Sequence, residues 1–297
     1  MTELSSDPAL ATASSSRDHP DMDAGGILTR DPTALLERSS ELSRLHTLGT
    51  TAAEDQRGGV VLVSGEAGIG KTALLRQFCS SLPRRFSVLW GTCDPLFTPR
   101  PLGPLLEPAA DTGGELAILV EGGARPHEVT GALLGELRGC APCVLVLEDL
   151  QWADEATLDV VRLLARRIET AAVLVALSFR DDCLHRDHPL QIVLGELPGR
   201  DRTARLELTG LSRSAVGVMA EDSVLDADEL YARTAGNPFF VTESVAAGTE
   251  IVPPTVRDAV LARVARLGAP ARSLLDAVAE VPQRAEVWLL ESMTDGG

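Results

Sequence analysis

Lysine is nearly absent from this sequence. The 297 residues contain 27 basic side chains, of which Lys71 is the single lysine and the rest are arginines. Aromatic residues are also scarce, at 3%, so aliphatic side chains and arginine must supply most of the packing and positive charge. The two cations differ in shape and hydrogen-bonding geometry, so a lone lysine in an arginine-rich chain points to a local requirement for a compact ammonium group.

Acidic side chains outnumber basic ones, 43 to 27, so the formal net charge is −16, and no long run of arginines offsets it. A field of this sign repels nucleic acid and anionic membranes, so we expect no direct DNA binding by this chain. The longest strongly apolar run, residues 171–179, is about half the roughly 20 residues needed to cross a bilayer. The N-terminus lacks the basic-then-apolar order of a signal peptide. These features predict a cytoplasmic protein without a membrane partner.

Cysteine is present at five positions, an odd number that argues against a disulfide framework. The stretch CAPC, Cys140 to Cys143, has the spacing of a metal or redox motif. No second CxxC and no nearby histidine accompany it, which favours two small thiols leading into a buried strand.

The first part of the chain divides into a tail and an entry helix. Residues 1–30 are rich in Ser, Ala and Asp without a hydrophobic period, which predicts a disordered tail. Asp31 as N-cap and Pro32 at the first helical position then predict a helix. Its leucines at positions 35, 42, 45 and 48 lie on roughly one face.

Residues 31–210 have the pattern of an α/β domain. Four short, continuously apolar runs and a weaker fifth one are separated by amphipathic stretches, and continuous hydrophobicity indicates burial on both faces. Interleaved helices then favour an open, central parallel sheet flanked by helices. The five runs are residues 60–64, 86–90, 143–148, 173–179 and 204–211.

Beyond residue 210 the strand pattern stops and helical patterns follow. We expect a small helical domain over 211–250, with helices in 212–221, 226–236 and 238–248. A further helix would place Val256, Val260, Val264 and Leu267 on one face. The apolar stretch 285–293 needs a surface to cover it, so it either folds back or meets a partner.

The eight residues around the lone lysine form a phosphate-binding motif. Glycines let a loop turn its N–H groups inward, and the helix N-terminus that follows adds positive potential. Lysine then supplies a point charge for the β and γ phosphates, and threonine a hydroxyl for Mg²⁺. The predicted nucleotide-binding residues are Gly65, Glu66, Ala67, Gly68, Ile69, Gly70, Lys71 and Thr72.

Two acids and an arginine at the ends of other strands complete the predicted site. A phosphate-binding loop of this kind, a P-loop, needs an acid at the end of a neighbouring strand. Glu148 ends the third apolar run and Asp149 follows it. One of these two carboxylates can bind the metal ion while the other acts on water. Arg180 ends the fourth run and would lie beside the γ-phosphate if that strand neighbours the P-loop strand. The alternative for Arg180 is a structural salt bridge to Asp181 or Asp182.

Several motifs together resemble those of the signal-transduction ATPases with numerous domains (STAND), which are AAA-type P-loop NTPases. The resemblance is to the N-terminal ATPase module of large LuxR-type transcriptional regulators of actinobacteria, and it extends over nearly the whole chain after residue 34. The stretches that carry it include VLVSGEAGIGKTALL, LVLEDLQWADEATLD, SFRDD, AGNPFFVTE and PPTVRDAVLARVARL.

The resemblance implies a P-loop sheet, a small helical domain, and the incomplete start of a winged-helix-like domain over 251–297. It also implies Arg38 near adenine and ribose, and Pro238 on the nucleotide. Glu148 would lie on Mg²⁺ with Thr72, Asp149 on water, and Arg180 on the γ-phosphate. The family pattern has glycine before the arginine and an acid after it, where this chain has Glu37 and Ser39. Glu148 is one methylene longer than the usual aspartate, which leaves contact with Mg²⁺ through water as an alternative.

The leading hypothesis is an ATP- or ADP-binding switch with Mg²⁺ and slow ATP hydrolysis, in which nucleotide closes the P-loop domain on the helical domain. Its output would be nucleotide-dependent self-association or contact with a separate effector domain. One alternative is a P-loop kinase or other phosphotransferase with a small acceptor. Another is a truncated nucleotide-binding regulator without output.

Overall fold

The structure is a computed structural model that describes residues 35–96, 98–197, 202–248 and 252–280. The predicted tail, residues 1–30, the helix-start residues Asp31 and Pro32, and the apolar stretch 285–293 lie outside the described residues.

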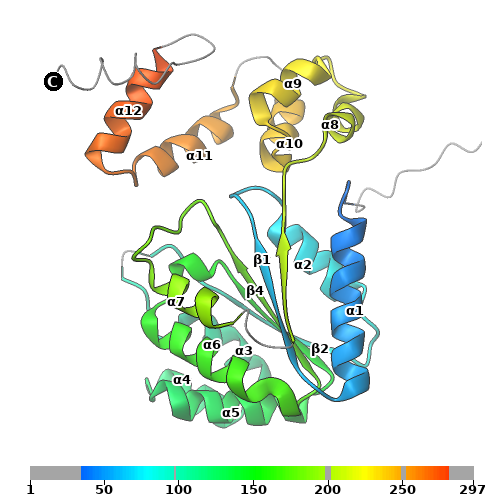
Figure 1. Ribbon diagram of the computed structural model, residues 1–297, viewed down its shortest axis with the longest axis vertical. Coiled ribbons are helices and arrows are strands. Elements are labelled where there is room, and N and C mark those ends of the chain that lie inside the picture. Colours follow the sequence, from blue (N-terminus) through cyan, green and yellow to red (C-terminus); the bar gives the residue numbers. More distant parts are fainter. Residues whose placement is uncertain (1–34, 97, 198–201, 249–251, 281–297) are drawn as a thin grey trace, which may run out of the picture. The chain divides into compact units, whose positions relative to one another are not determined.

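A five-stranded parallel sheet forms the centre of the fold (Figure 1). Its strand order is β2-β3-β4-β1-β5, so β1 lies between β4 and β5. The strands are β1 (Gly59–Ser64), β2 (Ser87–Thr92), β3 (Cys143–Glu148), β4 (Val173–Phe179) and β5 (Thr203–Glu207). Each lies within about two residues of its predicted start, and the α/β fold with a parallel sheet is confirmed.

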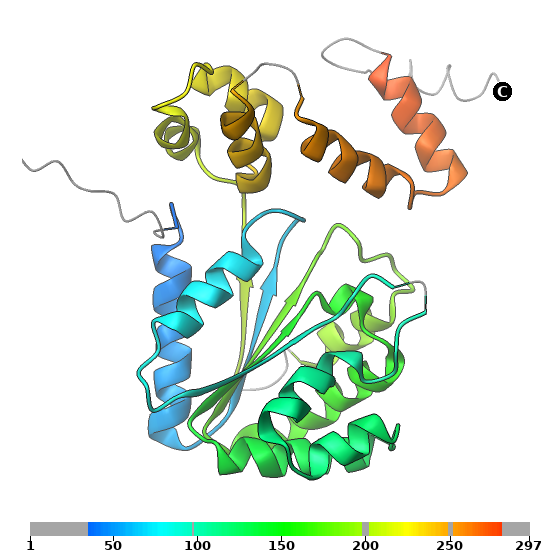
Figure 2. The same cartoon turned by 180° about the vertical axis from the view of Figure 1, so that it is seen from behind.

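Helices cover both faces of this sheet (Figures 1 and 2). One face carries α1 (Ser39–Asp55) and α2 (Lys71–Ser80). The other carries the helices between β2 and β5. These are α3 (Leu106–Thr112), α4 (Glu115–Glu121), α5 (Pro126–Gly139), α6 (Glu155–Arg167) and α7 (Pro189–Glu196), with short 3₁₀ turns η1 (Gly103–Leu105), η2 (Leu150–Trp152) and η3 (Ile168–Thr170).

Alternate residues of each central strand enter different cores. On β1, Val61 and Val63 pack with Phe78 of α2, whereas Val60 and Leu62 face the core beneath α3 to α7. The strands β3 and β4 alternate in the same way. Burial on both faces explains why these runs are continuously apolar instead of alternating with polar residues.

Three short helices follow the sheet and form a third core of their own. They are α8 (Arg213–Ala220), α9 (Ala227–Thr234) and α10 (Pro238–Ala247). Each begins at a side-chain cap, from Ser212, Asp226 and Asn237 respectively. Such caps satisfy N–H groups that have no partner within the helix. Helices α11 (Pro254–Val264) and α12 (Ala269–Ala279) come next.

The structure corrects three details of the sequence interpretation. Helix α1 begins at Ser39, not at residue 31, and Leu35 precedes it. Strand β5 ends at Glu207, after which Leu211 N donates to Gly236 O at 2.8 Å as the chain leaves the sheet. Of the predicted α11 face, Val256 is 9% exposed but Val260 is 41% exposed.

The five cysteines are free thiols, and Cys143 is buried at the start of β3 as expected from the sequence. In the described part of the chain, no set of three or more His, Cys, Asp or Glu side chains is grouped to hold a metal ion. None of the described helices combines the length and apolarity needed to cross a membrane.

Candidate functional site

The loop between β1 and α2 is built around glycines. Gly65, Gly68 and Gly70 have φ angles of 144°, 82° and 101°, a region that side chains with a Cβ rarely enter. Gly70 is also the N-cap of α2. The loop therefore presents backbone N–H groups together with the positive end of a helix dipole, which is the arrangement that binds phosphate.

Lys71 begins α2, and its ammonium group lies back over the loop. Nζ donates hydrogen bonds to Gly65 O at 2.7 Å and to Glu66 O at 2.9 Å. Lys71 is 7% exposed. Burial lowers the pKa of its amine, and the negative charge of Asp149 partly raises that pKa. An ammonium group held by neutral carbonyls can exchange them for phosphate oxygens, which form stronger, charge-assisted bonds.

Glu148, at the end of β3, lies between two neutral donors. Its Oε1 accepts from Thr72 Oγ1 at 2.6 Å, and its Oε2 accepts from Trp90 Nε1 at 3.2 Å. Glu148 is 5% exposed, and burial raises the pKa of its carboxyl group, whereas the bond from Thr72 lowers it. A hydroxyl and a carboxylate in direct contact are oxygen ligands of the kind Mg²⁺ prefers, so the donor set fits this ion.

The sequence interpretation assumed that the strand ending in Glu148, β3, lies directly beside the P-loop strand, β1. In the structure these two strands are not neighbours. Strand β4 lies between β1 and β3. Glu148 nevertheless reaches Thr72, because the carboxyl ends of parallel strands share one edge of the sheet. Arg180 does follow a strand next to β1, as expected.

Asp149 and Arg180 face each other at this edge. Asp149 has a φ angle of 56°, and its N–H donates to Ser178 Oγ at 3.2 Å. Its Oδ1 lies 3.7 Å from Arg180 Nε. The side-chain amide of Gln151 donates to the same Oδ1 at 2.9 Å. The ion pair thus joins Arg180 to Asp149 instead of to Asp181 or Asp182, the partners considered from sequence.

The turn before α10 is bonded directly to the P-loop. Asn237 Nδ2 donates to Ala67 O at 3.0 Å, and Phe239 N donates to Gly68 O at 3.2 Å. Arg263 Nη2, from α11, donates to the same Ala67 oxygen at 3.1 Å. Movement of the P-loop backbone therefore affects the contacts of α10 and α11.

Arg38 donates hydrogen bonds to backbone carbonyl groups of the P-loop and of the linker after β5. This residue is 5% exposed, and its Nη2 donates to Thr209 O at 2.5 Å and to Ile69 O at 3.5 Å. The preceding Glu37 accepts from Ser212 N at 2.7 Å. Arg38 thus holds the linker after β5 against the P-loop.

A cavity of about 470 Å³ lies between these elements. That volume is within the range of small-molecule sites. It is bounded by the P-loop, the end of β4, the linker after β5 and the turn before α10. The lining residues are Gly65, Glu66, Ile69, Asp181, Asp182, Glu207, Leu208, Thr209, Gly210, Thr234, Ala235 and Asn237. Asn237 lines the cavity, and of the predicted site residues Gly65, Glu66 and Ile69 do so as well. The other predicted residues are not among those that line it: Arg38, Ala67, Gly68, Gly70, Lys71, Thr72, Glu148, Asp149, Arg180 and Pro238.

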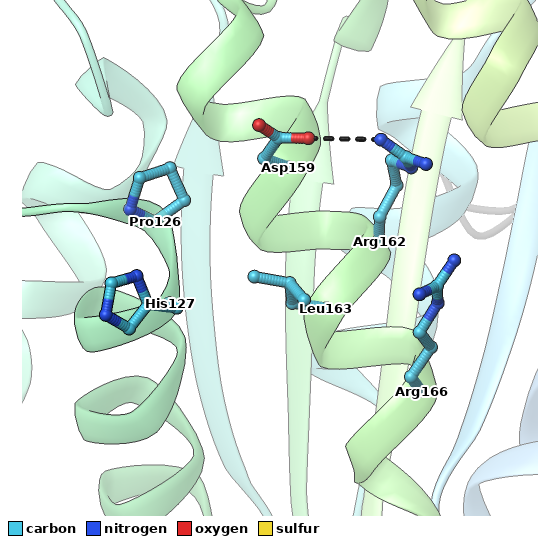
Figure 3. Close-up of a pocket in the computed structure, with 6 residues that line it drawn as sticks. All are labelled: Pro126, His127, Asp159, Arg162, Leu163 and Arg166. Carbon is cyan, nitrogen blue, oxygen red and sulfur yellow. Dashed lines mark hydrogen bonds and ion pairs between the residues drawn. The ribbon is translucent and has the colours of Figure 1, made fainter.

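A second cavity of about 320 Å³ lies between α5 and α6 (Figure 3). Its two arginines are already neutralised, because Arg162 and Arg166 lie 2.6 Å and 3.0 Å from the carboxylate of Glu196. Arg162 also pairs with Asp159 at 3.2 Å. None of the six residues that line it is a predicted site residue. The cavity at the P-loop is therefore the candidate functional site.

Sequence reasoning missed four polar partners of this site. Asn237 caps α10, but its bond to Ala67 joins residues far apart in the chain. Gln151 and Trp90 bond the two predicted acids, and Arg263 bonds the P-loop. No spacing rule in the sequence points to these contacts, because each depends on how elements pack.

Replacing Gly68 with alanine is expected to destabilise the chain more than the same change at Gly70. A Cβ at Gly68 would lie 2.7 Å from Phe239 Cβ and 2.9 Å from Asn237 Oδ1, whereas one at Gly70 meets nothing within 4 Å. Both variants adopt a strained φ, at about 1–2 kcal/mol each. In thermal unfolding without nucleotide, the Tm of Gly68→Ala should be several degrees lower than the Tm of Gly70→Ala. Equal Tm values would contradict the packing of α10 on the loop.

Comparison with known proteins agrees with this geometry. Residues 34–176 match the family model described as the AAA ATPase domain. A search of curated proteins found no match. The match covers the P-loop, Glu148 and Asp149, and ends within β4, before Arg180. This part of the chain is thus similar to an ATPase domain, which implies nucleotide binding.

Solved structures show the same fold. The chain is similar to the Orc1 protein of Aeropyrum pernix, solved in complex with DNA, with 18% identity and a TM-score of 0.51 over 89% of this chain and 78% of that one. It is also similar to a Walker-type ATPase of Pyrococcus abyssi, with 14% identity and a TM-score of 0.54 over 89% and 85%. At these identities the similarity establishes the fold alone, an α/β fold with a parallel sheet flanked by helices.

Proposed function

We propose that the chain binds ATP with Mg²⁺ at the P-loop, hydrolyses it slowly and acts as a conformational switch of the kind found in transcriptional-regulator ATPases. The observation that carries this proposal is the pair of hydrogen bonds from Asn237 and Phe239 to the P-loop. Phosphates bound by the loop would act on the same backbone segment that holds α10.

Each site residue has a distinct role in the proposal. The N–H groups of the loop and Lys71 hold the β and γ phosphates. Thr72 and Glu148 would hold Mg²⁺, which neutralises phosphate charge when bound. Asp149 orients a water molecule and accepts its proton, and Arg180 stabilises negative charge on the γ-phosphate.

The walls of the cavity accommodate the nucleoside in this proposal. Arg38 fixes the backbone at Thr209, and the turn at residues 234–237 closes the opposite side. Pro238 begins α10 next to Asn237, where it fixes the φ angle of the first helical residue. A nucleotide in this cavity would contact both the sheet domain and the helices, so its γ-phosphate could set their geometry.

The variant Asn237→Ser tests the switch. Serine can still cap α10 by accepting from Phe239 N, but its shorter side chain cannot reach Ala67 O. In the wild type we expect amide hydrogen exchange in α10 to differ between the ATP-bound and ADP-bound states. In Asn237→Ser we expect that difference to shrink, with ATP affinity changed by less than about tenfold, since one hydrogen bond is lost.

The matched control is Asp226→Ser, which changes the cap of α9, where Asp226 accepts from Asp228 N and Glu229 N. It should keep the nucleotide-dependent exchange difference in α10. Identical exchange of α10 in the ATP, ADP and nucleotide-free states of the wild type would contradict the switch.

A further inference from the structure

Gln151 links the two groups to which the proposed function assigns the hydrolytic step. Its side chain is 4% exposed, in the η2 turn two residues after Asp149. Nε2 donates to Asp149 Oδ1 at 2.9 Å, and Oε1 accepts from the backbone N–H of Arg180 at 3.0 Å. One amide group therefore connects the end of β3 to the end of β4.

The backbone of Gln151 is held as firmly as its side chain. Its carbonyl oxygen lies 3.1 Å from Nε2 of His188, and His188 is the residue that caps α7. Side-chain donor, side-chain acceptor and backbone carbonyl all have partners on different segments. The amide can hardly rotate without breaking at least two hydrogen bonds, and each costs about 1 kcal/mol or more to leave unmade in a buried site.

Asp149 needs such a support, because its own backbone is strained. Its φ angle of 56° lies in the left-handed region, which costs a residue with a Cβ about 1–2 kcal/mol. The ion pair with Arg180 is long, at 3.7 Å, and both side chains are partly exposed. The bond from Gln151 is the shorter of these two contacts to Oδ1 and comes from the more buried partner.

We infer that Gln151 is a positioning residue for ATP hydrolysis, which fixes the Asp149 carboxylate and the Arg180 backbone in one geometry. This inference rests on the proposed function, because it assumes that Asp149 acts on water. Gln151 itself need not touch the nucleotide, since both ends of its side-chain amide already have partners in Asp149 and Arg180.

Two variants separate the functions of the amide. Gln151→Glu has nearly the same shape and keeps an acceptor for Arg180 N–H, but loses the donor to Asp149. Gln151→Met loses both bonds while keeping a similar length. We expect kcat to fall about 10- to 100-fold in both variants, as for small misplacements of a catalytic group, with KM and ATP affinity within about threefold of the wild type.

Hydrogen exchange of the Arg180 amide supplies a readout that does not depend on activity. It should remain slow in Gln151→Glu and become faster in Gln151→Met, because only the second variant removes its acceptor. Gln191→Met, on the exposed face of α7, is the matched control and should leave both kcat and this exchange rate unchanged.

A double-mutant cycle tests whether Gln151 acts through Asp149. In an Asp149→Asn background, Gln151→Glu, which keeps the acceptor for the Arg180 N–H, should cause no further loss in single-turnover hydrolysis of labelled ATP. Additive losses, an unchanged kcat in both folded single variants, or a fall in ATP affinity as large as the fall in kcat would each overturn the inference.

The same experiments distinguish failure of the inference about Gln151 from failure of the proposed function. An active wild type that requires Asp149 but tolerates both Gln151 variants would overturn the inference alone. A wild type without ATPase activity would overturn the proposed hydrolysis, and the inference with it.

Discussion

Replacing Lys71 with alanine is expected to weaken ATP binding by about 100-fold or more. The ammonium group would otherwise form charge-assisted hydrogen bonds to phosphate in a buried site, and two such bonds contribute about 3 kcal/mol or more. The chain has no second lysine that could substitute. Calorimetric titration of the purified chain with ATP in the presence of Mg²⁺ would measure the change.

Two further variants define what the position requires. Lys71→Arg keeps the charge but places a planar fork where Gly65 O and Glu66 O hold an ammonium group at 2.7 Å and 2.9 Å. We expect it to bind ATP poorly as well. Arg84→Ala removes an exposed cation beyond the far end of α2 and should bind like the wild type. Wild-type affinity in Lys71→Ala would contradict the role of this residue.

A chemical experiment on the unmodified protein gives an independent readout. An amine-selective acylating reagent can modify only Lys71 and the α-amino group, because the sequence has one lysine. The lowered pKa of Lys71 increases its unprotonated, reactive fraction, although its burial slows access. Mass spectrometry should show that ATP with Mg²⁺ protects Lys71 and leaves labelling of the N-terminus unchanged.

Replacing Asp149 with asparagine is expected to lower kcat for ATP hydrolysis by about 10²- to 10⁴-fold, the contribution typical of a general base. Asparagine keeps an Oδ1 that can accept the bond from Gln151, so the position of the side chain should be retained. ATP affinity should stay within about threefold of the wild type, because the lost carboxylate acts on water and not on the ground-state nucleotide.

A phosphate-release assay, paired with calorimetry, separates these two quantities. Asp111→Asn, an exposed residue in α3, is the matched control and should hydrolyse ATP at the wild-type rate. Wild-type turnover in Asp149→Asn would contradict the assignment. ADP formation that appears only with a small acceptor would favour a phosphotransferase instead.

The sequence predicted the sheet well, because its strands are buried on both faces. Val60 to Val63 and Val144 to Leu147 each alternate between two cores, so every position is apolar and the pattern is unambiguous. The sequence placed Arg180 beside the γ-phosphate on the condition that its strand neighbours the P-loop strand, and β4 does pair with β1.

The order of strands and the start of α1 were harder to predict. The sequence places Glu148 after the third strand, but nothing local shows that β4 intervenes between β3 and β1. Helix α1 starts late because Glu37 has a φ angle of 55° and bonds Ser212, 175 residues away. Glycine at this position would enter that region without strain.

Polar contacts between elements could not be predicted from the sequence either, because no local signal shows which elements pack together. Asn237 was predictable as a helix cap from its place before Pro238, but its bond to Ala67 depends on how α10 lies against the P-loop. Gln151 is a buried amide in a turn, and the sequence does not show that its two ends bond Asp149 and Arg180. Such partners emerge once the packing of the strand ends is known.

The central claim is that the loop from Gly65 to Thr72 binds nucleotide. Calorimetric titration of ATP with Mg²⁺ into the purified wild-type chain, after removal of any bound nucleotide, tests it most directly. We expect saturable binding at one site per chain, abolished or weakened about 100-fold or more by Lys71→Ala. Absence of binding by a folded wild-type chain, or binding that Lys71→Ala leaves unchanged, would contradict it.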